Sequence, residues 1–498
     1  MRLLRSRYAG LFLFALVFVA VSFLLRLALL VRSFSLADTG PLAIASVFGF
    51  GLLFDVLTCL WAMLPLALVV AIGGNRFLAG RIGRTLCLAF FGIGVFLVLF
   101  DAAVEWFYWE EFPSSRFNLI AVDYIHDFRV VLAYVWQAYP VLLITGALAA
   151  LAALVVLPLA RTVLGACQVP LRAGQRARFL ALYLVGLGLA MPLVMNLTLT
   201  NTSDNWTNKN LAKNGGLSFI SALLNRNVIY AEDLYLARDP VQTMTRLRGL
   251  LKTSNSRYVS ENVADITRQI DNGPESAWHN VIVIVVESLS AQFLGVFGDS
   301  RGLTPNLDEL AGRSILLTRM YACGTRTIRG LEALNLSLPP TPGRALGKRP
   351  NSNRLFSVER LFRDRGYRTL FFYGGYGNFD EMDAFLCNGE YELIDRPKFR
   401  PEEIHFASAW GICDGDTYRR AIRECDETHQ AGRKFFSMIL TLSNHTPFTY
   451  PQEIDIPSGT GLLGGSSKPT TPSASSSARS AKSPGSTTPS SSSWPTTV

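Results

Sequence analysis

The stretch His279-Asn-Val-Ile-Val-Ile-Val-Val-Glu287-Ser288 decides the fold of the second half of this chain. Its centre, Val281–Val286, is a continuous apolar run, which is typical of a strand buried on both faces of a sheet. The run ends in a carboxylate, and open α/β sheets bind their ligands at the carboxyl ends of the strands. It therefore predicts a buried strand with a candidate functional residue, Glu287, at its end.

Helix and strand patterns alternate after this run. We expect a helix opening at Thr304-Pro305, where proline suits the first turn. The further elements predicted are a strand over Ser314–Met320, a helix over Ser357–Arg365, a strand from Arg368 to Tyr373, a helix over Asp416–Thr428 and a strand over Phe435–Leu442. This alternation predicts an α/β domain with a mostly parallel sheet covered on both faces.

The first 200 residues are of a different class. The chain has 498 residues, of which 49% are apolar, and its mean hydropathy of +0.26 is too high for an ordinary soluble protein. A helix needs about 20 apolar residues to cross a bilayer. Stretches that satisfy this are Tyr8–Val31, Pro41–Ile72, Thr85–Phe100, Val130–Leu159 and Phe179–Leu199. The sequence therefore predicts a membrane α-helical bundle of five spans ahead of the α/β domain.

The net charge of +9 comes from arginines that flank these spans. They gather before the first span and after the second and fourth, which places the N-terminus in the cytoplasm by the positive-inside rule. Five spans then put everything after about Asn201 outside, so the α/β domain is expected to be periplasmic or extracellular. No basic stripe with interleaved aromatic residues occurs in the sequence, so no nucleic-acid partner is expected.

Two ionisable residues, Arg26 and Asp55, fall inside predicted spans. Such residues are functional candidates by default. The structural alternative, which we favour, is that Arg26 snorkels to the surface and Asp55 pairs within the bundle. In the later domain Cys323, Cys387 and two further cysteines could form disulfides, but no pairing follows from the sequence. No CxxC motif is present, so a thiolate zinc site is not expected.

Two further elements can carry chemistry. In Cys323-Gly-Thr-Arg-Thr327-Ile-Arg329, a hydroxyl stands where a helix is expected to begin. Thr327 can cap that helix, or it can be a nucleophile, because a helix N-terminus favours anions and a metal lowers the pKa of a hydroxyl. His445 follows directly after a predicted buried strand and can donate to a phosphate, although a lone histidine is as often structural.

The ordered set of motifs resembles the lipoteichoic acid synthase-like membrane phosphoglycerol transferases of the alkaline phosphatase/sulfatase superfamily. The matching signatures are Asn210-Leu-Ala-Lys-Asn-Gly215, Val286-Glu287-Ser288, Thr304-Pro-Asn-Leu, Arg326-Thr327 before Arg329-Gly330, Phe371-Phe-Tyr-Gly-Gly375 with Phe379-Asp380, and Ser443-Asn-His445-x-Pro-Phe448. The resemblance runs from near Met1 to about Gly461.

The resemblance implies that Glu287 and Thr327 ligate Mn²⁺ or Mg²⁺. It implies that Thr327 attacks the phosphodiester of a phosphatidylglycerol-like lipid in a bacterial inner membrane, with an envelope glycan or lipid as acceptor. His445 would bind the phosphate and Arg329 would help neutralise it, while Thr325 is a rival nucleophile. Phosphoethanolamine transfer, hydrolysis of sulfuric or phosphoric esters, and a non-catalytic membrane relative remain as alternatives. True sulfatases carry a C/S-x-P-x-R motif, which Cys323-Gly-Thr-Arg does not supply.

The end of the chain departs from the family. Members carry an Asp-His pair that completes the metal site, and this sequence contains no Asp-His. Residues 462–498 are Ser/Thr/Pro-rich. One explanation is a disordered tail. The explanation that we favour is that the gene is read out of frame after about Gly461. The codons of Trp494-Pro-Thr-Thr, read two bases later, permit Ala-Asp-His. We therefore expect a five-span domain over 1–200, a helical connector over 201–275 and a C-terminally incomplete catalytic domain over 276–461, which would fold poorly and lack turnover.

Overall fold

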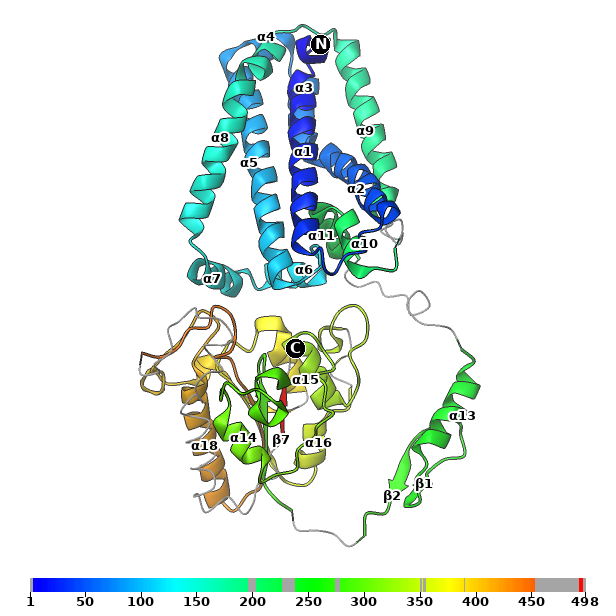
Figure 1. Ribbon diagram of the computed structural model, residues 1–498, viewed down its shortest axis with the longest axis vertical. Helices are drawn as coiled ribbons and strands as arrows, with labels where there is room; N and C mark the ends of the chain where they lie inside the picture. Colours follow the sequence, from blue (N-terminus) through cyan, green and yellow to red (C-terminus); the bar gives the residue numbers. More distant parts are fainter. Residues whose placement is uncertain are drawn as a thin grey trace. The chain divides into compact units, whose positions relative to one another are not determined.

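The structure is a computed structural model that describes residues 3–195, 203–225, 238–273, 278–349, 352, 355–388, 390–452 and 492–495. The chain forms two compact units, Met1–Arg226 and Asn227–Val498, each of which is described by itself (Figure 1). Residues 196–199 of the fifth predicted span, and the predicted tail apart from residues 492–495, lie outside the described residues.

The first unit is helical. Its helices are α1 (Ala9–Arg32), α2 (Pro41–Ala62), α3 (Leu64–Ile72), α4 (Asn75–Ala79), α5 (Arg81–Glu111), α6 (Leu119–His126), α7 (Phe128–Ala138), α8 (Val141–Ala166), α9 (Ala173–Met195), α10 (Trp206–Ala212) and α11 (Gly215–Leu224). In the described part, four helices are long and apolar enough to cross a membrane, namely α1, α2, α5 and α8. The fifth predicted span coincides with α9 as far as Met195.

Two predicted spans are each divided by proline. The stretch Pro41–Ile72 is α2 and α3, and Pro65 lies in the first turn of α3. Likewise, the stretch Val130–Leu159 begins inside α7 and continues in α8, with Pro140 between them. Proline lacks the N–H that would continue a helix and clashes with the turn before it, but the first turn tolerates it. The hydrophobicity of a stretch does not by itself show that the stretch forms two helices.

Charged residues are buried within the first unit. Arg26 and Asp55 form an ion pair with an N–O distance of 2.7 Å, and both side chains are 1% exposed. The pairing of Asp55 within the bundle is thus confirmed, but the prediction that Arg26 snorkels is wrong. Gly51 makes room for the guanidinium, because a methyl group at that position would collide with it. A second buried pair joins Glu105 to Arg116.

Helices α10 and α11 are bonded into this bundle. Arg26 Nε donates to the carbonyl of Leu211 over 2.9 Å, and Asn214 Nδ2 donates to Asp55 Oδ1 over 2.9 Å. Asn208 Nδ2 donates to the carbonyl of Asp38 over 2.8 Å. Residues of the predicted connector up to Leu224 therefore pack with the first unit, which extends beyond residue 200.

The second unit is built on a parallel sheet. Its strand order is β5-β4-β6-β3-β7, and each neighbouring pair is parallel. The strands are β3 (Val281–Val286), β4 (Arg368–Tyr373), β5 (Glu392–Ile394), β6 (Phe435–Leu440) and β7 (Ser492–Pro495). The helices include α14 (Pro305–Ala311), α15 (Thr327–Leu336), α16 (Val358–Arg363), α17 (Met382–Asn388) and α18 (Asp414–Gln430). The predicted α/β class and parallel sheet are confirmed.

A separate small element precedes this sheet. Helix α13 (Pro240–Leu251) is followed by an antiparallel pair of strands, β1 (Ser256–Tyr258) and β2 (Arg268–Ile270). The strand predicted over Ser314–Met320 is wrong, because these residues are irregular and Ile315 is 91% exposed. An apolar run becomes a strand only where a neighbour takes up its backbone hydrogen bonds, and none does so in the described part.

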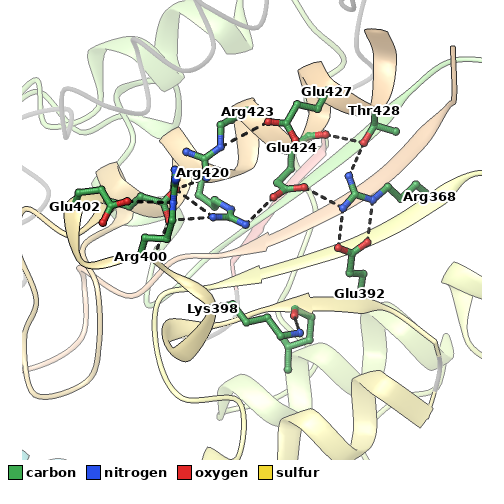
Figure 2. A network of polar contacts seen from close by, with 12 residues as sticks. Arg368, Glu392, Lys398, Arg400, Glu402, Arg420, Arg423, Glu424, Glu427 and Thr428 are labelled. Atoms are coloured by element: carbon green, nitrogen blue, oxygen red, sulfur yellow. Dashed lines mark hydrogen bonds and ion pairs between the residues drawn. The ribbon is translucent and has the colours of Figure 1, made fainter. Parts of the chain in front are cut away.

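An ion-pair network binds α18 to the sheet edge (Figure 2). Arg368 on β4 pairs with Glu392 on β5 over 2.7 Å and with Glu424 on α18 over 2.9 Å. Arg420 joins Glu424, over 2.8 Å, to Glu403, over 3.0 Å. The network fixes α18, whose first turn lies at the candidate site described below.

Acid is expected to weaken this network through Glu403. Burial opposes ionisation of this carboxyl, but bonds from the Arg400 amide and from the side chains of Arg400 and Arg423 lower its pKa to about 2. Because the folded-state pKa lies below the unfolded value of about 4.5, the stabilisation is present above pH 4.5 and is lost as the pH falls through 2. Thermal unfolding followed from pH 5 to pH 2 should show a smaller acid loss in Glu403→Gln than in the wild type. Glu402→Gln is the control, and equal behaviour of the two variants would contradict the prediction.

Candidate functional site

The two residues on which the predicted chemistry depends lie in contact. Glu287 follows β3, and Thr327 is the first residue of α15. The Thr327 hydroxyl donates to Glu287 Oε2 over 2.7 Å, and Glu287 is buried. The cap position of α15 is taken by Arg326, so the Thr327 hydroxyl does not serve as the helix cap. Of the two candidate threonines, Thr327 is the one bonded to Glu287.

The loop that carries His445 runs beside Glu287. The Glu287 amide donates to Thr441 Oγ1 over 2.8 Å, and Asn444 Nδ2 donates to the Glu287 carbonyl over 3.4 Å. The imidazole of His445 packs on the Trp410 ring, with 4.1 Å between the ring centroids. The parallel order of β3 and β6 explains this arrangement, because their carboxyl ends meet at one edge of the sheet.

Arg329 is directed elsewhere. Its guanidinium donates to Glu332 Oε2 over 3.1 Å and to the carbonyl of Gly343. The structure therefore does not bring this arginine to the Glu287–Thr327 pair by any bond that it describes. The arginine adjoining Thr327 in the chain, Arg326, instead donates to both carboxylate oxygens of Asp380, over 3.1 and 3.0 Å.

Asp380 pairs with two cations, one of which, Arg326, precedes Thr327 in the chain. Besides Arg326, it accepts from the buried ammonium of Lys348. The backbone of Asp380 lies in the left-handed region with φ of 58°, which aspartate tolerates better than most residues. Arg326 and Asp380 lie within motifs of the resemblance that imply no role for them, and nothing in the sequence signals Lys348.

Asp414, at the first position of α18, is a further buried carboxylate that the sequence analysis missed. It accepts from the amide of Leu442 over 2.6 Å and from that of Ser443 over 3.2 Å. Burial raises the pKa of Asp414 to about 6 against the effect of these bonds, and the nearby Glu287 carboxylate acts in the same direction. Two carboxylates close together leave the site short of positive charge.

The donors at this edge suit a hard divalent cation in kind. Mg²⁺ and Mn²⁺ prefer carboxylate and hydroxyl oxygens, which Glu287 and Thr327 provide. These two residues provide too few donors, because such a cation takes about six ligands. In the part of the chain that the structure describes, no group of three or more His, Cys, Asp and Glu side chains could hold a metal ion. The described cysteines, Cys323, Cys413 and Cys425 among them, are free thiols, and the side chain of Cys387 lies outside the described residues.

Part of the second unit matches a known protein family. Residues 279–461 match the sequence model of the Sulfatase family. Mouse iduronate 2-sulfatase is 21% identical over 211 residues, which are 35% of this chain and 36% of that protein, so the chain spans about a third of this relative's length.

Two solved structures are similar over part of the chain. A protein in the alkaline phosphatase superfamily from Vibrio parahaemolyticus is 28% identical over 51% of this chain and 62% of its own, with a TM-score of 0.44. The lipoteichoic acid synthase LtaP from Listeria monocytogenes is 20% identical over 41% of this chain and 52% of its own, with a TM-score of 0.35.

Proposed function

We propose that the chain is built for transfer of phosphoglycerol from a phosphatidylglycerol-like lipid to an envelope glycan or lipid, a proposal supported by the match of residues 279–461 to the Sulfatase family. The observation that carries the proposal is the hydrogen bond between Thr327 and Glu287, in a chain whose first unit has four membrane-length apolar helices. We further propose the orientation given by the positive-inside rule, with the N-terminus in the cytoplasm of a bacterial inner membrane and the second unit on the opposite side.

The residues have distinct tasks in this reaction. Thr327 Oγ1 attacks the phosphorus of the lipid head group, the bond from phosphorus to the diacylglycerol oxygen breaks, and the diacylglycerol leaves as the free alcohol with the proton that the Thr327 hydroxyl gives up. Glu287 accepts the hydrogen bond of the Thr327 hydroxyl and orients it for attack. His445 donates to a phosphate oxygen. An acceptor hydroxyl then displaces Thr327 from the phosphothreonine intermediate and takes the phosphoglycerol group.

Mn²⁺ or Mg²⁺, held by Glu287 and Thr327, would favour the ionised hydroxyl and neutralise phosphate charge. Arg326, which adjoins Thr327 in the chain, pairs with Asp380, as does Lys348. The cationic side chain of Arg326 supports an anionic substrate and fits phosphoethanolamine transfer equally well. Sulfate-ester hydrolysis is less favoured, since the threonine occupies the nucleophile position and the C/S-x-P-x-R motif is lacking.

Turnover is expected to require residues beyond those of the printed sequence. We propose that the chain as printed does not transfer phosphoglycerol, because the Asp-His pair of the family is missing from it. We also propose that reading the gene two bases later after about Gly461 restores that pair. Resequencing the DNA there tests the second proposal directly, and finding no alternative open frame would remove it.

The proposed reaction is tested by the mass of the peptide that contains Thr327. The frame-restored protein, incubated with Mn²⁺ and phosphatidylglycerol labelled in its head group, is expected to gain labelled phosphoglycerol on Thr327. Thr327→Val, which removes the hydroxyl at constant shape, and the chain as printed should both remain unlabelled. Label from phosphatidylethanolamine instead would favour phosphoethanolamine transfer. If the restored protein remains unlabelled with either lipid, the non-catalytic alternative holds.

A further inference from the structure

We propose that Asp414 is a positioning residue that fixes the loop carrying His445 against the Glu287–Thr327 pair. The inference rests on the proposed function to the extent that His445 is taken to bind phosphate. It adds a residue for which neither the motifs nor the comparisons provide a role.

The contacts of Asp414 form a reciprocal clamp between α18 and the loop after β6. Its carboxylate accepts from the consecutive amides of Leu442, over 2.6 Å, and Ser443, over 3.2 Å. In return, the Asp414 amide donates to Ser443 Oγ over 3.1 Å. Leu442 and Ser443 precede His445 by three and two residues. Leu442 is buried, and an unpaired amide in buried surroundings is unfavourable. Loss of the carboxylate should therefore change the path of the loop.

The loop that Asp414 holds also contacts Glu287 and Trp410. On one side, Thr441 and Asn444 bond to the backbone of Glu287. On the other, Trp410 Nε1 donates to the carbonyl of Thr446 over 2.7 Å, and the Trp410 ring packs on His445. Asp414 holds Leu442 and Ser443, which lie between Thr441 and Asn444 and precede the Trp410 contacts of His445 and Thr446. Without it, the imidazole is expected to leave the Trp410 ring.

Asp416 provides a matched control in the same helical turn. It is also buried, and Asp416 Oδ2 accepts from the amides of His405, over 2.8 Å, and Phe406, over 3.3 Å. Its Oδ1 lies 2.8 Å from Nδ1 of His405. The two aspartates thus hold two different loops, and each of these loops carries one histidine.

The experiment follows the histidine resonances of the full chain in detergent. The protein has five histidines, so ¹³C-histidine labelling gives a short spectrum, in which His445→Gln and His405→Gln assign the two signals. Asp414→Ala should shift the His445 signal toward that of an exposed histidine, because the ring current of Trp410 is lost, and should leave His405 unchanged. Asp416→Ala should shift the His405 signal and leave the His445 signal unchanged. Asp414→Asn, which keeps an acceptor oxygen, should preserve most of the wild-type shift.

A second measurement asks whether the position of His445 matters for phosphate. The probe is sn-glycerol 1-phosphate, titrated with Mn²⁺ present. Asp414→Ala should weaken binding roughly tenfold, the lower end of the range for residues that orient the ligands of a metal. In a protein that already carries His445→Ala, the further substitution Asp414→Ala should change the affinity for the probe little. Asp416→Ala should leave the affinity unchanged.

The outcomes separate the two proposals. An unchanged His445 resonance in Asp414→Ala overturns the inference, whatever the probe does. An Asp414→Ala protein that weakens binding equally with and without His445 also overturns it, because the effect would then not pass through the histidine. If the wild-type protein does not bind the probe, the phosphate site of the proposed function loses its support, while the resonances still decide the role of Asp414.

Discussion

Replacing Arg26 by alanine is expected to destabilise the first unit by about 3–5 kcal/mol, the usual effect of removing one partner from a buried ion pair. The substitution leaves the Asp55 carboxylate, which is 1% exposed, without its guanidinium. It also removes the donor to the Leu211 carbonyl on α10. The effect can be followed by the labelling of Cys59, a buried thiol in α2, as the protein is heated in detergent.

Arg32 gives the matched control on the same helix. It pairs with Glu110 over 2.6 Å, but its side chain is 57% exposed, so Arg32→Ala should change stability by less than about 1 kcal/mol. The double variant Arg26→Met/Asp55→Leu should recover much of the loss, because it leaves no unpaired charge. If Arg26→Ala proves no more harmful than Arg32→Ala, the buried pair is not important for stability.

Asp380→Asn is expected to destabilise the second unit by a similar amount, about 3–5 kcal/mol. Asparagine tolerates the left-handed backbone and keeps a hydrogen-bond acceptor, so the substitution isolates the loss of charge. Arg326 and the buried Lys348 would then face a neutral partner. Labelling of the buried thiol of Cys425 on α18 during heating measures the change.

Glu381→Gln is the control for this variant. Glu381 adjoins Asp380 in the chain, its φ of 56° is also left-handed, and it pairs with Arg344 over 2.6 Å. Its side chain is a third exposed, so the substitution should have an effect of less than about 1 kcal/mol. Similar losses in the two variants would mean that backbone conformation, and not the buried charge, determines stability here.

The fold follows largely from patterns that the sequence displays. Val281–Val286 is a continuous apolar run and Phe435–Leu440 is apolar except for Ser437, and they form the neighbouring parallel strands β3 and β6. Because both strands run in one direction, residues that follow them reach the same edge of the sheet. The contact between Glu287 and Thr327 was expected from the family resemblance, and the hydrogen bond between them agrees with that expectation.

What the sequence did not reveal are partnerships between distant residues. Arg26 looked like a snorkelling side chain because its position near a span end is visible, whereas Gly51, which makes room for its guanidinium, and the Leu211 carbonyl are not. Asp414 looked like an ordinary first-turn residue of a helix. The place of Arg329 in a motif predicts that it binds phosphate, but Arg329 pairs with Glu332, which lies about one turn later in the same helix.

The bonds from α10 and α11 into the bundle determine where the first unit can be cut from the chain. A fragment ending at residue 200 would lack the Leu211 carbonyl that accepts from Arg26 and the Asn214 amide that donates to Asp55. It would also lack Gly215, which lies so close to the Glu105 carboxylate that a methyl group would not fit between them. For expression by itself, the first unit should therefore be terminated after Leu224, so that Arg26, Asp55 and Glu105 keep their contacts with α10 and α11.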